Sequence, residues 1–135
     1  MKYFKIFSII VLLILLGLSF SFNTKIREQY SLSILQRQLN LEQWNISMVY
    51  GDVEKDFVAS IDIDSTYYKA VITVDKNLGR PLSRHELTHE LIHIYVNEIY
   101  TYVVNKYEIK SQKELDDLHY YNERLTEAFT KVYTK

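Results

Sequence analysis

Residues 85–93 read HELTHELIH, which contains two overlapping copies of the pattern His-Glu-x-x-His. Residues four positions apart on an α-helix lie on the same face, so two such histidines can direct imidazole nitrogens at one metal ion. The glutamate that follows the first histidine then lies beside the ion, where it can take a proton from an activated water. The pattern is typical of zinc-dependent hydrolases, and we expect Zn²⁺ as the cofactor.

The doubled pattern allows two registers for the metal site. In the first register, His85 and His89 are the ligands and Glu86 is the general base. In the second register, His89 and His93 are the ligands and Glu90 is the base. His89 is therefore a ligand in both.

The start of the helix favours the second register. Ser83 and Glu86 have the spacing of a capping box, which engages the Glu86 side chain with the backbone of the first turn. The second register lies further into the helix among apolar residues, which exclude water and strengthen the field of an ion. We predict His89 and His93 as ligands with Glu90 as base; the alternative ligand and base are His85 and Glu86.

A third ligand is expected from another element, because catalytic zinc usually keeps three protein ligands and one open position. Residues 122–127 read NERLTE, within a helix predicted over 113–133. Glu123 is the predicted third ligand. Glu127, one turn later, is predicted to accept the second ring hydrogen of a ligand histidine.

The same helix permits a plainer interpretation. Its stronger apolar stripe points away from Glu123, so both carboxylates could belong to a solvated face. His119, one turn before Glu123, is expected to face solvent. The stripe is formed by Leu118, Tyr121, Leu125 and Val132.

The remaining elements predict an α+β fold. A helix is expected over 24–39, and runs of alternating apolar residues predict strands at 44–50, 57–63 and 68–74. Because short turns join successive strands, we expect a three-stranded antiparallel meander. The histidine helix and the C-terminal helix follow it.

A peptide substrate is expected to pair along an exposed edge of this meander, at 70–74. Asp62 and Asp64 share an exposed strand face, and we expect them to be solvated rather than to bind calcium. Four tyrosines are possible partners for a developing oxyanion, and none is assigned that role. They are Tyr95, Tyr100, Tyr120 and Tyr121.

Residues 1–22 are predicted to be a signal peptide or an N-terminal membrane anchor. Lys2 and Lys5 precede an uncharged apolar run that ends at Phe22. Residues 23–135 are then a single domain. We expect this domain either to be anchored to a membrane, on the side away from the cytoplasm, or to be secreted. A formal net charge of -1 without a basic stripe argues against a nucleic-acid partner.

The two motifs together, HELTH and NERLTE, resemble the gluzincin zinc peptidases of the thermolysin-like clan. In that clan, HExxH on one helix is completed by a glutamate on the next helix, within an N-E-x-x-[ST]-[DE] pattern. The strands before the histidine helix resemble those of the compact phage and bacterial members. The resemblance covers residues 40–133 and implies a minimal zincin-like fold and a bacterial or phage origin.

The resemblance leaves two points open. Thermolysin itself favours the first register, whereas the compact members align with the second. The chain also lacks the C-terminal domain of thermolysin, which supplies an extra histidine for the transition state, so no oxyanion stabiliser is identified.

We therefore expect a zinc-dependent peptidase that cleaves a peptide or protein substrate with metal-activated water and a glutamate base. Two alternatives remain. One is a catalytically inactive zincin-fold module with a binding or regulatory role. The other is a dedicated regulatory protease of a mobile element that cuts one partner.

Overall fold

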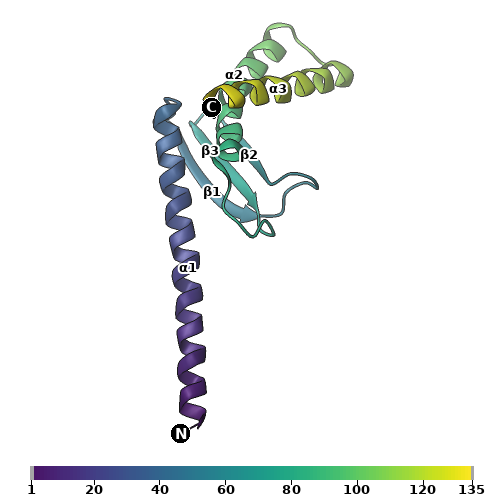
Figure 1. The fold of residues 1–135 in the computed structure, drawn as a ribbon. Helices are drawn as coiled ribbons and strands as arrows, with labels where there is room; N and C mark the ends of the chain where they lie inside the picture. Colours follow the sequence, from purple (N-terminus) through teal and green to yellow (C-terminus); the bar gives the residue numbers. More distant parts are fainter. Residues whose placement is uncertain (1, 135) are drawn as a thin grey trace.

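The computed structural model describes the backbone of residues 2–134 and the side chains of residues 10–16 and 26–134. It has the predicted α+β class, and helix α1 is followed by three strands and two helices (Figure 1). The elements are α1 (Lys2–Gln38), β1 (Asn45–Gly51), β2 (Ala59–Asp64), β3 (Lys69–Asp75), α2 (Arg84–Lys106) and α3 (Gln112–Tyr133).

The sheet is mixed, so the predicted antiparallel meander is wrong. Its order is β1-β3-β2. β3 pairs antiparallel with β2, as a hairpin predicts, but it also pairs parallel with β1, placing Asn45 opposite Lys69. Alternation determines which face of a strand is apolar but not which strand lies beside it. The central strand is the one with the most buried side chains: Ala70, Ile72 and Val74 are at most 1% exposed.

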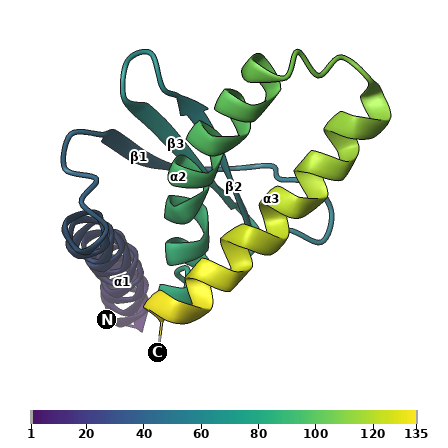
Figure 2. The same ribbon diagram turned by 90° about the horizontal axis from the view of Figure 1, so that it is seen from above.

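A single cluster of buried side chains joins the sheet to α1 and α2. Figure 2 shows α2 lying across the sheet, with the C-terminal end of α1 beside it. Burial of these apolar side chains is the main stabilising contribution to the fold. The cluster includes Leu32, Leu35 and Leu39 of α1, Trp44, Ile72 and Val74 of the sheet region, and Leu87, Leu91 and Ile94 of α2.

Helix α1 combines the predicted N-terminal segment and the helix predicted over 24–39 in one continuous helix. Its C-terminal part is held to the sheet by a polar contact as well as by the leucines. Glu28 is buried and accepts a hydrogen bond from the Tyr50 hydroxyl on β1. Burial, together with the Glu28 carboxylate, raises the pKa of Tyr50 to about 12, so Tyr50 remains a donor at neutral pH.

The signal peptide or membrane anchor predicted at 1–22 lies largely outside the described side chains. Within it, residues 10–16 are described, and their apolar side chains are between 38% and 62% exposed. No helix among the described residues combines the length and the apolarity needed to cross a membrane.

Helix α3 packs against α2 with its polar face. Thr126 and Thr130 are fully buried, whereas Leu125 is 38% and Val132 is 68% exposed. The predicted apolar stripe therefore does not form the contact with α2. Because Glu123 lies on the polar side of α3, this packing turns it toward the histidine helix.

Candidate metal centre

Three predicted ligands lie together at the contact between α2 and α3. The Nε2 atoms of His89 and His93 are 3.2 Å apart. Carboxylate oxygens of Glu123 lie 3.6 Å from Nε2 of His89 and 3.5 Å from Nε2 of His93. Among the described residues, these three form the only group of at least three such side chains able to hold a metal ion.

The spacing of these atoms can be compared with a coordination polyhedron. Zinc–ligand distances of about 2.0 to 2.1 Å in tetrahedral geometry place neighbouring donor atoms about 3.3 to 3.4 Å apart. An octahedral ion with bonds of about 2.1 Å would place adjacent donors about 3.0 Å apart. Here the two Nε2 atoms are 3.2 Å apart, and each faces a different oxygen of Glu123, Oε2 at 3.6 Å for His89 and Oε1 at 3.5 Å for His93. The three side chains are therefore close enough to hold one ion between them.

The outer nitrogens of both histidines have partners on α3. Nδ1 of His93 shares a hydrogen bond of 3.4 Å with the Thr126 hydroxyl, and Nδ1 of His89 lies 3.4 Å from a Glu127 oxygen. Such partners favour a proton on Nδ1 and leave Nε2 with its lone pair. Two lone pairs that face each other repel, so a cation between them would stabilise this arrangement.

In the absence of a metal, a proton can replace part of its charge. Glu123 raises the pKa of His89, and the contact with His89 lowers the pKa of Glu123. Burial lowers the pKa of His93, which favours its neutral imidazole. A neutral imidazole and an ionised carboxylate are the forms that coordinate metals.

Glu90 is positioned differently from the three ligand residues. It is 8% exposed, it borders the same cavity, and its carboxylate makes no hydrogen bond to any residue that the structure describes. Burial raises the pKa of Glu90 to about 7; the Glu123 carboxylate acts in the same direction and His89 opposes it. A carboxylate with a pKa near neutrality is suited to general-base chemistry.

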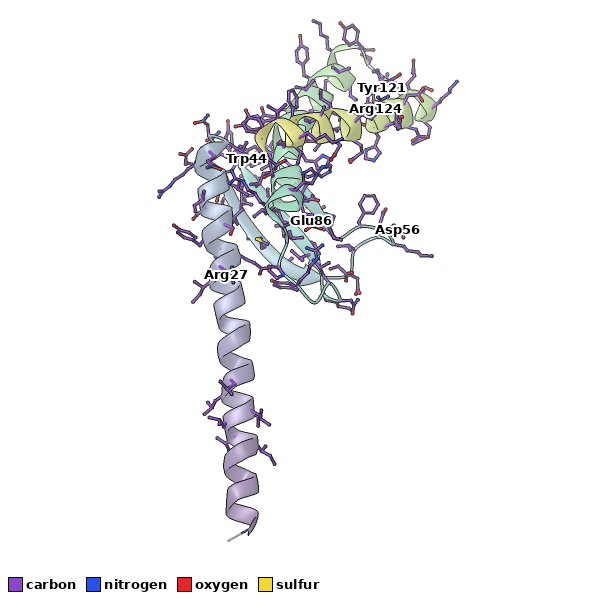
Figure 3. All side chains as sticks on the ribbon, in the orientation of Figure 1. Arg27, Trp44, Asp56, Glu86, Tyr121 and Arg124 are labelled. Atoms are coloured by element: carbon purple, nitrogen blue, oxygen red, sulfur yellow. The ribbon has the colours of Figure 1, made fainter. Side chains whose placement is uncertain are left out.

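The alternative base, Glu86, has a structural role at the N-terminus of α2 (Figure 3). Its carboxylate accepts from the backbone of Ser83 at 2.7 Å, while the Ser83 hydroxyl accepts from the Glu86 amide at 3.2 Å. This is the predicted capping box. Both carboxylate oxygens also accept hydrogen bonds from Arg80, at 2.6 and 2.8 Å. These contacts lower the pKa of Glu86 to about 2, which makes it a weak base.

The alternative ligand, His85, lies outside the group of three. Its Nε2 is 3.5 Å from Glu127 and its Nδ1 is 3.3 Å from the Thr134 hydroxyl. The side chain is 45% exposed. Its position agrees with the second register, in which His85 is a neighbour of the site.

Replacing Glu86 with alanine is expected to lower the free energy of unfolding by about 1 kcal/mol at pH 7, by removing a helix cap and an ion pair. Because Arg80 is half exposed, solvent screening keeps the ion-pair part small. The pKa of Glu86 is lowered on folding from 4.5 to about 2, so its contribution is present above pH 4.5 and is lost as the pH falls toward 2.

Urea denaturation of both proteins at pH 7 and near pH 2 measures this difference. Glu86→Gln is the matched control, since glutamine keeps the capping hydrogen bond but not the charge. Its free energy of unfolding should lie between those of the wild type and Glu86→Ala. Equal stability of the wild type and Glu86→Ala at pH 7 would contradict the assigned role.

A groove of about 620 Å³ opens beside the three ligand residues. One wall is strand β2 and the loop before it, and the other is formed by α2 and α3. β2 is at one edge of the sheet, whereas β3 is paired on both sides. The substrate edge predicted at 70–74 is therefore wrong: those residues belong to the central strand, and β2 forms the edge that borders the groove.

The groove lining includes some of the other residues considered from the sequence and excludes the rest. Tyr100 lines it, whereas Tyr95 donates a hydrogen bond to the Leu39 carbonyl and Tyr120 and Tyr121 are exposed outside its lining. His119 also lines the groove while remaining exposed, so it faces both the site and solvent.

The two aspartates of β2 are exposed, as expected. Asp62 borders the groove, whereas Asp64 accepts a hydrogen bond from the Thr66 amide in the turn after the strand.

Sequence reasoning missed three residues around the site. Thr126 was not recognised as a partner of His93, although it occupies the serine or threonine position of the NERLTE pattern. Arg80 was not recognised as the partner of Glu86, because an exposed arginine before a helix has no distinctive signal. Asn97 lines the groove one turn after His93 on the same helix face, a spacing that could have indicated it.

Comparison with protein-family models, with curated proteins and with solved structures gave no match to this chain.

Proposed function

We propose that this protein is a zinc-dependent peptidase of the gluzincin class, with His89, His93 and Glu123 as the metal ligands. The observation that carries the proposal is the convergence of the two Nε2 atoms and the Glu123 carboxylate beside a buried, unpartnered carboxylate. Two imidazoles and one carboxylate form a ligand set that zinc accepts in catalytic sites. Bound zinc would supply a Lewis acid that activates water and polarises a peptide carbonyl.

Two imidazoles and a carboxylate also bind iron(II) in oxygenases, in which the metal keeps several open positions. One feature favours hydrolysis here: Glu90 adds a general base next to the ligands, which hydrolysis requires.

In the proposed reaction, Glu90 accepts a proton from the attacking water and later delivers it to the leaving amine nitrogen. Its raised pKa suits both transfers, because the group must be ionised first and protonated afterwards. Glu127 and Thr126 hold the two imidazoles in position through their Nδ1 atoms. Tyr100 and His119 line the groove and are among the groups available to hydrogen-bond a developing oxyanion.

The substrate is proposed to be an extended peptide that adds to the edge of β2. Residues 59–63 border the groove, and an edge strand offers unpaired backbone groups to such a peptide. Main-chain pairing along β2 would lay the scissile bond alongside the ligand residues. The groove is on the α2 side of β2, so the peptide would run between the sheet edge and the two helices.

We further propose that the N-terminal segment attaches the domain to a membrane or directs its export. The exposed apolar side chains of residues 10–16 and the lysines before them support this proposal. A dedicated protease of a mobile element and a catalytically inactive module are the alternatives that remain for the domain.

Metal removal tests the proposed function. The full-length protein should bind one equivalent of zinc, measured by elemental analysis, and should cleave an unstructured protein such as casein. A chelator should abolish cleavage, and added zinc should restore it. Zinc binding without cleavage of any peptide would support the inactive module instead, and a chain that binds no zinc would overturn both.

A further inference from the structure

The charge of the groove beyond the metal ligands is the starting observation. Its lining contains five carboxylates and, among the described residues, no lysine or arginine. Two of these carboxylates, Glu90 and Glu123, belong to the proposed catalytic group. The other three are Asp52, Glu54 and Asp62, on β2 and the loop before it.

Two of the three remaining carboxylates are uncompensated. Asp52 pairs with Lys76 at 2.7 Å. Glu54 and Asp62, by contrast, make no ion pair and no side-chain hydrogen bond with any part of the chain that the structure describes. Both residues border the groove. Ile61 and Ile63 pack toward the core, so the Asp62 side chain between them belongs to the exposed face of β2 rather than to the face beside Glu90. Unpaired carboxylates along one sheet edge create a local field that favours a cationic ligand.

The position of Asp62 indicates where such a cation would lie. Side chains alternate along β2, and the residue of β3 directly opposite Asp62 is the uncharged Val71. A peptide that added to the free edge would place one of its residues opposite Asp62 on the same face. Opposite charges at such cross-strand positions attract, and like charges destabilise the pairing.

We infer that the free edge of β2 selects a basic peptide, with a lysine or arginine paired across this edge from Asp62 and a second basic residue near Glu54. The inference rests on the proposed function, because it takes the groove to be the substrate site. It adds the substrate class: acidic segments are repelled, and uncharged ones bind more weakly than basic ones.

Peptide binding to the full-length, zinc-loaded Glu90→Gln protein tests this inference, because that variant should bind substrate without cleaving it. Three fluorescent peptides of equal length would be compared by anisotropy, with threonine alternating with lysine, glutamine or glutamate. The lysine peptide is expected to bind about tenfold more tightly than the glutamine peptide at low salt, and the glutamate peptide most weakly.

Single charge removals locate the effect. Asp62→Asn should weaken binding of the lysine peptide about threefold to tenfold and leave binding of the glutamine peptide unchanged. Asp56→Asn is the matched control: Asp56 lies on the same loop as Glu54 but outside the groove lining (Figure 3), and its φ of 78° is one that asparagine tolerates.

Equal binding of the three peptides, or no binding of the lysine peptide, would overturn the inference, as would an equal loss in Asp56→Asn. The results that would refute this inference differ from the results that would refute the proposed function. Cleavage of basic and uncharged peptides with equal efficiency would refute charge selection and leave the peptidase intact. Selective binding of the lysine peptide by a chain that takes up no zinc would do the reverse.

Discussion

Replacing Glu90 with glutamine is expected to reduce peptide hydrolysis by about two to four orders of magnitude, the usual contribution of a general base. Glutamine has nearly the same shape but cannot accept a proton from water. Glu90 is not among the three donors that converge on the proposed metal position, so zinc binding should be unchanged. The variant should also fold, because the carboxylate that it replaces has no hydrogen bond to lose among the described residues.

Turnover of a fluorogenic peptide and zinc content would be measured on the same Glu90→Gln preparation. Glu86→Gln is the matched control, since it makes the same chemical change at the equivalent position of the other register. It should retain turnover within a factor of about three, because its carboxylate is occupied by Ser83 and Arg80. If Glu86→Gln abolishes turnover and Glu90→Gln does not, the first register is correct.

Replacing His89 with alanine is expected to abolish stoichiometric zinc binding. The Nε2 of His89 is within 3.6 Å of both other donors, so its loss leaves two ligands and an open side. The wild type should also gain stability from zinc, by about 2.7 kcal/mol when free zinc is a hundredfold above its Kd. The His89→Ala variant should show no such gain.

Isothermal titration with zinc and thermal unfolding with and without a chelator would measure both effects. His85→Ala is the control, because His85 is the neighbouring histidine outside the group of three ligand residues. The zinc affinity of this variant should stay close to that of the wild type. Glu127→Gln should be intermediate, losing about tenfold to a hundredfold in affinity through the orientation of His89. Retention of full zinc affinity by His89→Ala would rule out the proposed centre.

The local features near the site were predictable because short-range geometry produces them. The i, i+4 spacing of His89 and His93 requires only a helix, and the Ser83–Glu86 capping box requires only the start of that helix. The alternation of apolar residues predicted three strands for the same reason. Element order and type therefore follow from residues within a few positions of one another. The same is true of the competition between capping and catalysis for the Glu86 side chain.

The pairing of the strands could not be predicted in the same way. Alternating apolar residues orient each strand toward the core but do not choose its neighbour. The choice depends on which strand buries most surface when it is central, and β3 does so because Ala70, Ile72 and Val74 are inaccessible once α1 and α2 cover the sheet. That burial depends on how the layers assemble. It explains why the exposed edge is β2 and not residues 70–74, as predicted.

The orientation of α3 is the clearest case in which tertiary packing overrode a sequence pattern. Its apolar stripe predicted that Leu125 and Val132 would be buried and that Glu123 could face solvent. Instead, Thr126 and Thr130 are buried against α2. Small hydroxyl side chains allow close packing, and their hydroxyl groups satisfy hydrogen bonds within the contact.

The amino-acid sequence by itself determined the chemistry that the chain can offer: a helix with two histidines in line, a glutamate that can act as a base, and a second helix with two carboxylates one turn apart. Only the tertiary structure decided which of these groups meet. Glu123 approaches His89 and His93 because α3 turns its polar face inward, and Glu90 has a raised pKa because the surrounding layers remove it from water. Distance and burial depend on contacts between residues far apart in the chain, which no local spacing encodes.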